Sequence, residues 1–212
     1  MFYCIFNWFF KITAWFLQWI CFRTKIHYID KSVQSRRIRG AAIIISNHTS
    51  VFDYGVYIFV FPLRTLRVLM AEVLFEKKPL NLLLKALGGI RVNRDAHSMS
   101  SMFKAEKILK KGGVVGIFPE GRLPLKTETP PLPFKIGAAY LALASGVPVI
   151  PVYTNGSYFN PKKRAHVIIG TPIDPADFNG ENSRKNIEAL NTAMRESIIA
   201  LEKELHERIG KG

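Results

Sequence analysis

The stretch Ala42-Ile43-Ile44-Ile45-Ser46-Asn47-His48-Thr49-Ser50-Val51-Phe52-Asp53 decides the fold. It opens with a short β-branched run, which is typical of a strand. The Ser-Asn pair that follows marks a change from strand to turn, and the sequence from Phe52 onward predicts a helix. His48 and Asp53 are therefore expected on a loop above a strand and on the first turn of the next helix, where their side chains can converge.

The same alternation of strand and helix continues along the chain. Further short β-branched runs predict strands at 114–118, 149–153 and 166–169, with weaker ones at 68–70 and 90–92. Helices are predicted at 52–61, 79–87, 98–111 and 135–145, and last where Ile187, Leu190, Met194, Ile198, Leu201, Leu205 and Ile209 recur every three or four residues. This alternation indicates an α/β fold with a mostly parallel or mixed central sheet covered by helices.

The composition is basic and apolar together. The 212 residues include 30 Lys and Arg against 16 Asp and Glu, a net charge of +14, and 48% of them are hydrophobic. We expect one domain, or one domain with an appendage. A soluble nucleic-acid-binding protein would explain the charge but not the apolar share, and we find no nucleic-acid-binding motif. A protein on an anionic membrane surface explains both, so we expect membrane phospholipids and no nucleic acid as partners.

Residues 1–22 form an apolar segment that holds all three Trp and ten of the 25 aromatic residues. It is just long enough to cross a bilayer as a helix. Asn7, Lys11 and Gln18 fall on one narrow face of that helix, however, and aromatic and aliphatic residues cover the rest. We therefore favour a helix in the membrane interface over one that spans the membrane, and a cleaved signal peptide least.

A basic cluster follows this helix and consists of Arg23, Lys25, Lys31, Arg36, Arg37 and Arg39. Such a cluster attracts anionic lipid and indicates the cytoplasmic face of a membrane, while a solvated linker is the alternative. We divide the chain into an N-terminal membrane-associated helix at 1–25 and an α/β domain at 26–212. The two cysteines, Cys4 and Cys21, lie in the apolar segment and predict neither a disulfide framework nor a metal site.

His48 and Asp53 are the first candidates for catalysis. A histidine whose other ring nitrogen is held by a carboxylate is the arrangement that takes a proton from a hydroxyl. The chain has no serine in a Gly-x-Ser-x-Gly setting, which argues against a serine acyl-enzyme. Taken alone, the pair would more often be a turn histidine and a helix N-cap.

Phe118-Pro119-Glu120-Gly121-Arg122 follows a predicted strand, at the edge where loops after parallel strands collect ligands. Gly121 permits a turn with exposed N–H groups, and the guanidinium of Arg122 can donate two parallel hydrogen bonds. Both kinds of donor suit the binding of a phosphate. Glu120 is expected to position Arg122 or to accept a substrate hydroxyl. Two more motifs are Gly88-Gly89-Ile90-Arg91-Val92-Asn93-Arg94, which ends in a second arginine, and the proline-bracketed strand Val147-Pro148-Val149-Ile150-Pro151-Val152.

The order of these four motifs resembles that of the glycerolipid acyltransferases with an HxxxxD motif, whose best known members are 1-acylglycerol-3-phosphate acyltransferases. The four blocks are similar, in order, to His48-x4-Asp53, Gly89-Ile90-x-Val92-x-Arg94, Phe118-Pro119-Glu120-Gly121-Arg122 and Val147-Pro148-Val149-Ile150-Pro151. The likeness spans about residues 40–172. One block alone is weak evidence, whereas four in order at similar separations are specific.

The resemblance implies transfer of a fatty acyl group from acyl-CoA or acyl carrier protein to the free hydroxyl of a lysophospholipid. No metal is implied, and no cofactor beyond the thioester co-substrate. His48 would be the general base and Asp53 would orient it, whereas Arg94, Glu120, Gly121 and Arg122 would bind the acceptor, chiefly its phosphate. The expected reaction converts 1-acyl-sn-glycerol-3-phosphate to phosphatidic acid in phospholipid biosynthesis. Backbone N–H groups near His48 or Gly121 are the expected donors to the developing oxyanion.

Two departures from the family pattern leave the acceptor open. Many lysophosphatidate enzymes have Glu-Gly-Thr-Arg-Ser in the third block, whereas here Arg122 follows Gly121 directly and Leu123-Pro124 come next. The family also often has a lysine pair before the second block, and the nearest stretch here, 70–74, has none. A lysophospholipid such as lyso-phosphatidylethanolamine is the alternative acceptor, and a non-enzymatic peripheral membrane protein is the competing hypothesis. The missing charge would come from Lys77, Lys78, Lys126 or Lys135. The proline-rich loop at 123–133 is expected to act as a lid.

Overall fold

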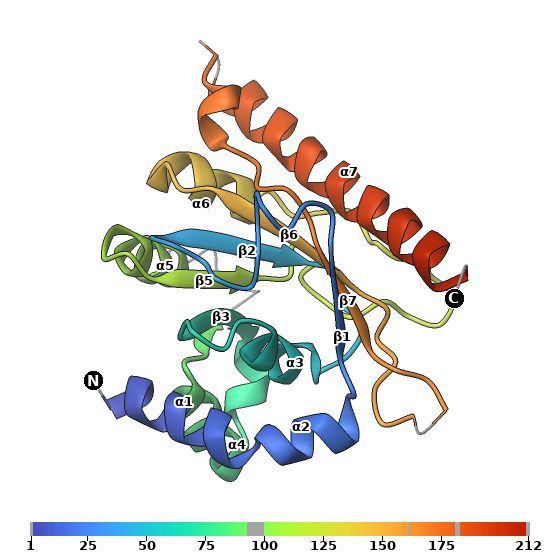
Figure 1. Ribbon diagram of the computed structural model, residues 1–212. Helices are drawn as coiled ribbons and strands as arrows, with labels where there is room; N and C mark the ends of the chain where they lie inside the picture. The colour runs from blue at the N-terminus through green and yellow to red at the C-terminus, as the bar shows by residue number, and fades with distance from the viewer. Residues whose placement is uncertain (1, 93–99, 161, 181–182, 211–212) are drawn as a thin grey trace.

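The computed structural model describes residues 2–92, 100–160, 162–180 and 183–210 (Figure 1). Its strands are β1 (Lys25–Tyr28), β2 (Ala42–Ser46), β3 (Leu66–Ala71), β4 (Ile90–Val92), β5 (Val114–Ile117), β6 (Val149–Thr154) and β7 (His166–Ile169). They form one seven-stranded sheet in the order β1-β7-β6-β2-β5-β3-β4. The neighbours from β6 to β4 are parallel, β7 runs antiparallel to β6, and β1 pairs parallel with β7. The predicted mostly parallel, mixed sheet is confirmed.

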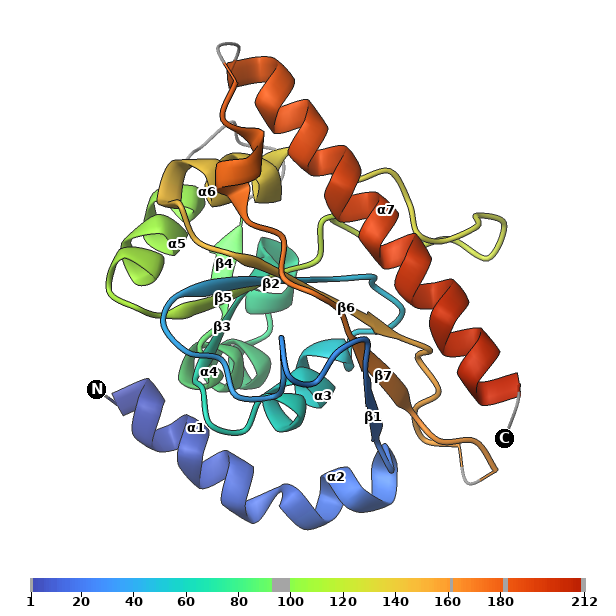
Figure 2. The same cartoon turned by 45° about the horizontal axis from the view of Figure 1, so that its top comes forward.

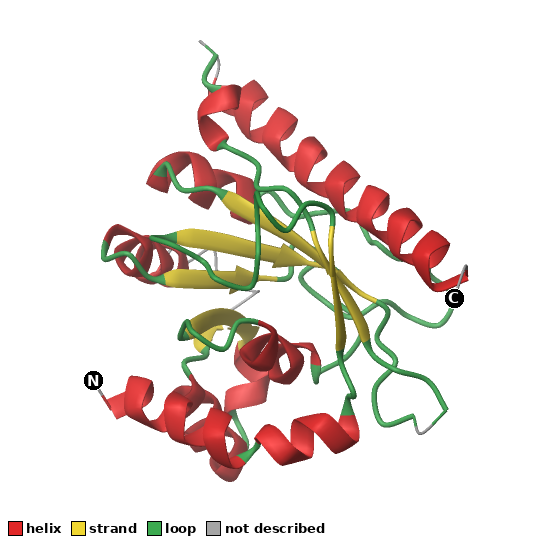
Figure 3. Ribbon diagram, viewed as in Figure 1, coloured by secondary structure: helices red, strands yellow, loops and turns green. Residues whose placement is uncertain are grey.

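Helices cover both faces of the sheet (Figure 3). They are α1 (Phe2–Thr13), α2 (Trp15–Cys21), α3 (Asp53–Val60), α4 (Lys78–Leu87), α5 (Ser100–Lys110), α6 (Gly137–Ser145) and α7 (Ser183–Gly210), with short 3-10 helices η1 (Glu72–Phe75) and η2 (Pro175–Phe178). One hydrophobic core joins α5, α6 and α7 to the sheet, and a second joins α3 and α4 to the opposite face. The chain is thus a three-layer α/β/α structure, with α1 and α2 packed outside α3 and α4.

The side-chain alternation along β2 explains the two cores. Ile43 and Ile45 pack with α5, α6 and α7, whereas Ala42 and Ile44 pack with α3 and α4. All four are almost fully buried, because a strand covered on both faces requires a continuous apolar run. Since β2 lies between β5 and β6, it delivers His48 to the middle of the carboxyl edge of the sheet.

The predicted strands and helices of the α/β domain are present, and the bounds that can be compared differ by at most two residues, except that α7 begins four residues before the periodic run that starts at Ile187. The start of the helix predicted at 98–111 lies outside the described residues. The sequence does not predict β1, because this four-residue edge strand has no buried residue and no apolar alternation. Lys25 of the basic cluster therefore belongs to the sheet and not to a linker.

The N-terminal segment forms two helices where one is expected. α1 ends at Thr13 and α2 begins at Trp15, with a turn at Ala14 between them (Figure 2). The expected polar face exists, but it faces the protein. Asn7 Nδ2 donates to Leu87 O at 3.2 Å, and Lys11 Nζ donates to Pro62 O at 3.0 Å and to Arg64 O at 2.6 Å.

The opposite face of these two helices is apolar and exposed. Its residues are between 44% and 73% exposed and comprise Ile5, Trp8, Phe9, Ile12, Trp15, Phe16, Trp19 and Ile20. A soluble helix normally shows the reverse arrangement, with its apolar stripe toward the core. Within the described ranges, no helix combines the length and the apolar character that a membrane crossing requires.

Candidate active site

The candidate catalytic residues meet at the carboxyl edge of the sheet, where neighbouring strands end. β2 leads into His48, β5 leads into Glu120, and β6 leads into the loop that carries Tyr158. Asn47 joins the first of these strands to the third, because its amide donates to Thr154 O and its Oδ1 accepts from Thr154 N, both at 2.9 Å. Parallel strands place their carboxyl ends at one edge, so residues distant in sequence converge here.

His48 and Asp53 form the predicted pair. His48 Nδ1 lies 2.8 Å from Asp53 Oδ2, and the Asp53 side chain is fully buried. The His48 ring stacks on Phe118, with the ring centroids 4.3 Å apart and the planes 17° from parallel. Because Nδ1 faces the carboxylate, Nε2 is the nitrogen that can exchange a proton with a substrate.

Asp53 is held by further donors besides His48. Its Oδ2 accepts from Thr49 N at 2.8 Å and Ser50 N at 2.9 Å, and its Oδ1 accepts from Thr49 Oγ1 at 2.9 Å and from Tyr158 OH at 2.7 Å. These backbone donors precede Asp53 in the chain. A helix N-cap accepts from the helical residues that follow it, and Phe52 occupies the cap position of α3. The alternative that Asp53 is an N-cap is therefore not what the structure shows.

Tyr158 is a site residue that the sequence does not reveal. Its hydroxyl lies 3.0 Å from Thr154 Oγ1 as well as 2.7 Å from Asp53. Burial raises the pKa of its phenol far above the usual range, so Tyr158 remains a hydrogen-bond donor. No spacing or periodicity connects Tyr158 with Asp53, because only the fold brings the β6–β7 loop to α3.

Glu120 links two loops at this edge. Its Oε1 accepts from His48 N and its Oε2 accepts from Leu132 N, both at 2.9 Å. The side chain is almost completely buried, and burial raises the pKa of its carboxyl. These contacts fix the backbone of His48 against the loop at 123–133. The expectation that Glu120 positions Arg122 is wrong, because another carboxylate does so; direct contact of Glu120 with an acceptor remains a prediction.

Arg122 pairs with Glu128 in the same loop. The guanidinium donates to Glu128 Oε2 at 2.6 Å and to Oε1 at 2.5 Å, and this bidentate bond lowers the pKa of Glu128 to about 2. The Arg122 side chain is 47% exposed. Arg122 therefore already presents its fork to an anionic group, as phosphate binding would require.

Lys135 lies across Gly121. Gly121 has a φ of +72°, and a Cβ added there would lie 2.9 Å from Lys135 Cε. A glycine is needed at this position both for its backbone conformation and for the approach of the lysine. Of the lysines considered as sources of extra charge, Lys135 is the one that the structure brings against the Glu120-Gly121-Arg122 motif.

The backbone N–H groups expected at the oxyanion are already engaged. His48 N donates to Glu120, Thr49 N and Ser50 N donate to Asp53, and Gly121 N donates to Phe118 O at 2.9 Å. These four N–H groups are therefore not available as donors to the oxyanion.

Two further predicted elements are Arg94 and the proline-bracketed strand. Arg94 lies outside the described residues, so its role remains a prediction. The proline-bracketed motif forms β6, which pairs with β2 on one side and β7 on the other. Thr154, the last residue of this strand, forms both hydrogen bonds with Asn47 and so holds the start of the loop that carries His48.

Comparisons with known proteins agree with this arrangement. A family model described as acyltransferase matches residues 12–155, which include His48, Asp53 and the Glu120-Gly121-Arg122 motif. A 1-acyl-sn-glycerol-3-phosphate acyltransferase of Bacillus subtilis is 30% identical over 138 residues, which cover 63% of this chain and 67% of the relative. A beta form from Homo sapiens is 33% identical over 136 residues, 61% of this chain and 48% of the relative.

Coverage differs among the relatives. A Haemophilus influenzae protein named 1-acyl-sn-glycerol-3-phosphate acyltransferase is 29% identical over 189 residues, 84% of this chain and 75% of its own. The chain spans about half the length of the human relative. The crystal structure of the 1-acyl-sn-glycerophosphate acyltransferase of Thermotoga maritima superposes with a TM-score of 0.65 at 20% identity, over 92% of this chain and 78% of that one, so the two share a fold. Since the family model covers well over half of the sequence, the chain belongs to the acyltransferase family.

Proposed function

We propose that this protein transfers a fatty acyl group from acyl-CoA or acyl carrier protein to the free hydroxyl of 1-acyl-sn-glycerol-3-phosphate, giving phosphatidic acid. The observation that carries the proposal is the His48–Asp53 pair, in which a buried carboxylate holds Nδ1 at 2.8 Å and leaves Nε2 for the acceptor. The names of the relatives at about 30% identity support this choice of acceptor.

The proposed step needs one proton transfer. The acceptor hydroxyl gives its proton to His48 Nε2 while its oxygen bonds to the carbonyl carbon of the thioester. The tetrahedral species then collapses, the carbon–sulfur bond breaks, and the departing sulfur takes the proton from His48. Ester and free thiol are the products, and no bond to the enzyme is formed. A positioned general base contributes typically 10²–10⁴-fold to such a rate.

Arg122 and Lys135 are the proposed ligands of the acceptor phosphate, together with Arg94. The planar guanidinium of Arg122 matches two phosphate oxygens, and Lys135 adds a positive charge close to Gly121. Glu120 and Gly121 shape this site, Glu120 by holding His48 N and Gly121 by its turn.

The N-terminal helices are the proposed membrane-docking element, on the cytoplasmic face. Because Asn7 Nδ2 and the Lys11 ammonium donate their hydrogen bonds inside the protein, the apolar face of α1 and α2 is free to enter one leaflet. The division at 25 between this element and the α/β domain is retained as a proposal. We expect Phe16→Lys to reduce sedimentation with phospholipid vesicles and Ile199→Lys, on α7, to leave it unchanged. Equal sedimentation of all three proteins would refute the docking surface.

The test of the reaction is acyl transfer in mixed micelles with either acyl-CoA or acyl carrier protein thioester as donor. Lysophosphatidate and lyso-phosphatidylethanolamine are offered as competing acceptors, and the His48→Ala protein is the control. We expect phosphatidic acid as the main product, and none above background from the variant. Preference for lyso-phosphatidylethanolamine would reassign the acceptor. No transfer to either lysolipid would favour the non-enzymatic membrane protein.

A further inference from the structure

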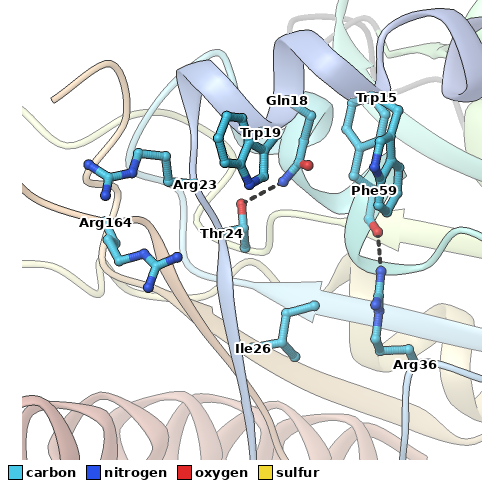
Figure 4. Close-up of a pocket in the computed structure, with 9 residues that line it drawn as sticks. All are labelled: Trp15, Gln18, Trp19, Arg23, Thr24, Ile26, Arg36, Phe59 and Arg164. Atoms are coloured by element: carbon cyan, nitrogen blue, oxygen red, sulfur yellow. Dashed lines mark hydrogen bonds between the residues drawn. The ribbon is translucent and has the colours of Figure 1, made fainter. Parts of the chain in front are cut away.

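A small cavity lies beneath α2, apart from the His48–Asp53 pair (Figure 4). Its volume is about 230 Å³. It is lined by residues of α2, of the turn from α2 into β1, of β1, of the β1–β2 loop, of α3 and of the β6–β7 loop, namely Trp15, Gln18, Trp19, Arg23, Thr24, Ile26, Arg36, Phe59 and Arg164. Ligand pockets for drug-sized molecules measure roughly 300–1,000 Å³, so this cavity suits a smaller chemical group.

The lining is strongly cationic. Three arginines contribute to it, and none of the nine residues in the described lining is acidic. Arg36 is anchored by its own hydrogen bonds, because Nε donates to Val60 O at 2.8 Å and Nη2 donates to Phe59 O at 2.7 Å. Arg23 and Arg164 belong to the end of the cavity opposite Arg36 (Figure 4). Cationic groups gathered in this way attract an anion, and the arginine fork matches the oxygens of a phosphate.

Arg23 has an unusual backbone conformation. It follows the end of α2 with a φ of +48°, a region in which glycine is the common residue after a helix. Arginine there carries a steric cost that glycine would avoid. The conformation turns the chain from α2 into β1, at the point where Arg23 joins the lining of the cavity.

The cavity also borders the proposed membrane surface. Trp15 and Trp19 line it while remaining 51% and 65% exposed, and Trp15 packs edge-on against Phe59 at 6.1 Å. Tryptophan prefers the level of the lipid head groups, where one part of the ring is apolar and the other is hydrated. Phe16 and Ile20, on the outer face of α2, are exposed beside them. An anion site and an apolar face thus share one helix.

We infer that this cavity binds the head-group phosphate of a membrane glycerophospholipid, with Arg23 and Arg164 on the phosphate, Trp15 and Trp19 at the glycerol level, and the acyl chains along the outer face of α2. The inference rests on the proposed docking of α1 and α2 and deepens it from general adsorption to a defined lipid site. The site is separate from the acceptor site, since neither His48 nor Arg122 lines it.

The test uses a short-chain phosphatidylglycerol below its critical micelle concentration, titrated into the full chain while tryptophan fluorescence is recorded. A monomeric lipid reports on a site and not on adsorption to a charged surface. We expect a saturable change that is reduced in Trp19→Phe, where Trp15 still reports from the lining, and fully retained in Trp8→Phe, because Trp8 lies on α1 outside the cavity. Inorganic phosphate serves as the competing probe and is expected to bind much more weakly, because it has no acyl chains.

Two charge variants complete the test. Arg23→Gln with Arg164→Gln should weaken lipid binding, by about fivefold for each arginine removed. Lys162→Gln with Lys163→Gln removes the same charge from exposed positions of the same loop, outside the lining, and should change binding by less than about twofold. Each protein is first shown to be folded by circular dichroism.

Several outcomes would overturn the site. These are the absence of saturable binding, an equal effect of the lysine pair, full binding by the arginine variant, or displacement by inorganic phosphate at the same concentration as lipid. The binding measurement needs no turnover, so it remains readable if the proposed reaction fails. Conversely, the arginine variant should still acylate a water-soluble short-chain lysophosphatidate while losing activity on vesicles, which separates a failure of this site from a failure of the enzyme.

Discussion

The hydroxyl of Tyr158 donates a hydrogen bond to Asp53 Oδ1 at 2.7 Å, across 105 positions of sequence. The same oxygen accepts from the Thr49 hydroxyl at 2.9 Å. Oδ2 is left to His48 Nδ1 and to two backbone N–H groups. Tyr158 therefore orients the carboxylate that holds His48, the proposed base, which makes Tyr158 a proposed positioning residue.

We expect Tyr158→Phe to lower kcat about tenfold and to leave the KM of the acceptor unchanged, because a hydrogen bond to a charged group contributes roughly 1.5 kcal/mol or more. Steady-state kinetics in mixed micelles measure both constants. Tyr140→Phe, on the exposed side of α6, is the matched control and should behave as wild type. If kcat is unaltered in Tyr158→Phe, the other donors suffice to orient Asp53.

His48→Ala should keep the fold and lose acyl transfer by a factor of about 10²–10⁴, the contribution of a positioned general base. Asp53→Asn should lower kcat strongly with little change in acceptor KM, because the amide cannot accept all the bonds that the carboxylate now accepts. Thermal melts establish folding for both proteins. Substantial turnover by purified His48→Ala would remove it from the chemistry.

Substitutions of Arg122 and of Glu128 are expected to change the KM of the acceptor in opposite directions. Glu128 occupies the fork of Arg122, so an acceptor phosphate has to replace it. Glu128→Gln should lower the acceptor KM severalfold, and Arg122→Ala should raise it, with kcat changing less in each case. Glu106→Gln, which removes a comparable surface ion pair with Lys110, is the control. An effect confined to the thioester donor would move Arg122 to the donor site.

Lys11 predicts a pH dependence of stability. Burial lowers its pKa from 10.5 to about 8. Between these values the unfolded chain still holds the proton that the folded protein has released, so the contribution of Lys11 to stability rises with pH. We expect the free energy of unfolding of wild type, relative to Lys11→Met, to increase from pH 8 to pH 10.5 by on the order of 3 kcal/mol at most.

Denaturant titrations of both proteins at several pH values measure this difference. All other titrating groups are common to the two proteins, so their effects cancel. A difference that does not vary with pH, or that falls as the pH rises, would contradict the lowering of the Lys11 pKa by burial.

The contact between His48 and Asp53 is predictable from sequence because its geometry is local. A buried strand, a short loop and the first turn of a helix place His48 and Asp53 together, and these elements follow from the apolar run before them. The α/β class follows from the same kind of signal, since strands and helices with strong periodicity alternate along the chain.

The partners of the pair are not predictable in this way. Tyr158 reaches Asp53, and Leu132 N reaches Glu120, only because the sheet order sets distant loops side by side. The inward orientation of Asn7 and Lys11 likewise depends on the carbonyl groups of Leu87, Pro62 and Arg64. Hydropathy indicates that a helix has two unlike faces, but not which of them meets the protein.

The β6–β7 loop joins the two regions that composition separates. Phe159 N donates to Cys21 O, Ala165 N donates to Phe22 O, and the ring of Phe22 packs edge-on against Tyr158 at 5.4 Å. The boundary drawn at residue 25 is thus a boundary of composition and not of contacts. A chimaera that exchanges residues 1–25 with those of a relative would set a foreign aromatic partner against Tyr158. A working chimaera therefore has to exchange the N-terminal helices and the β6–β7 loop together.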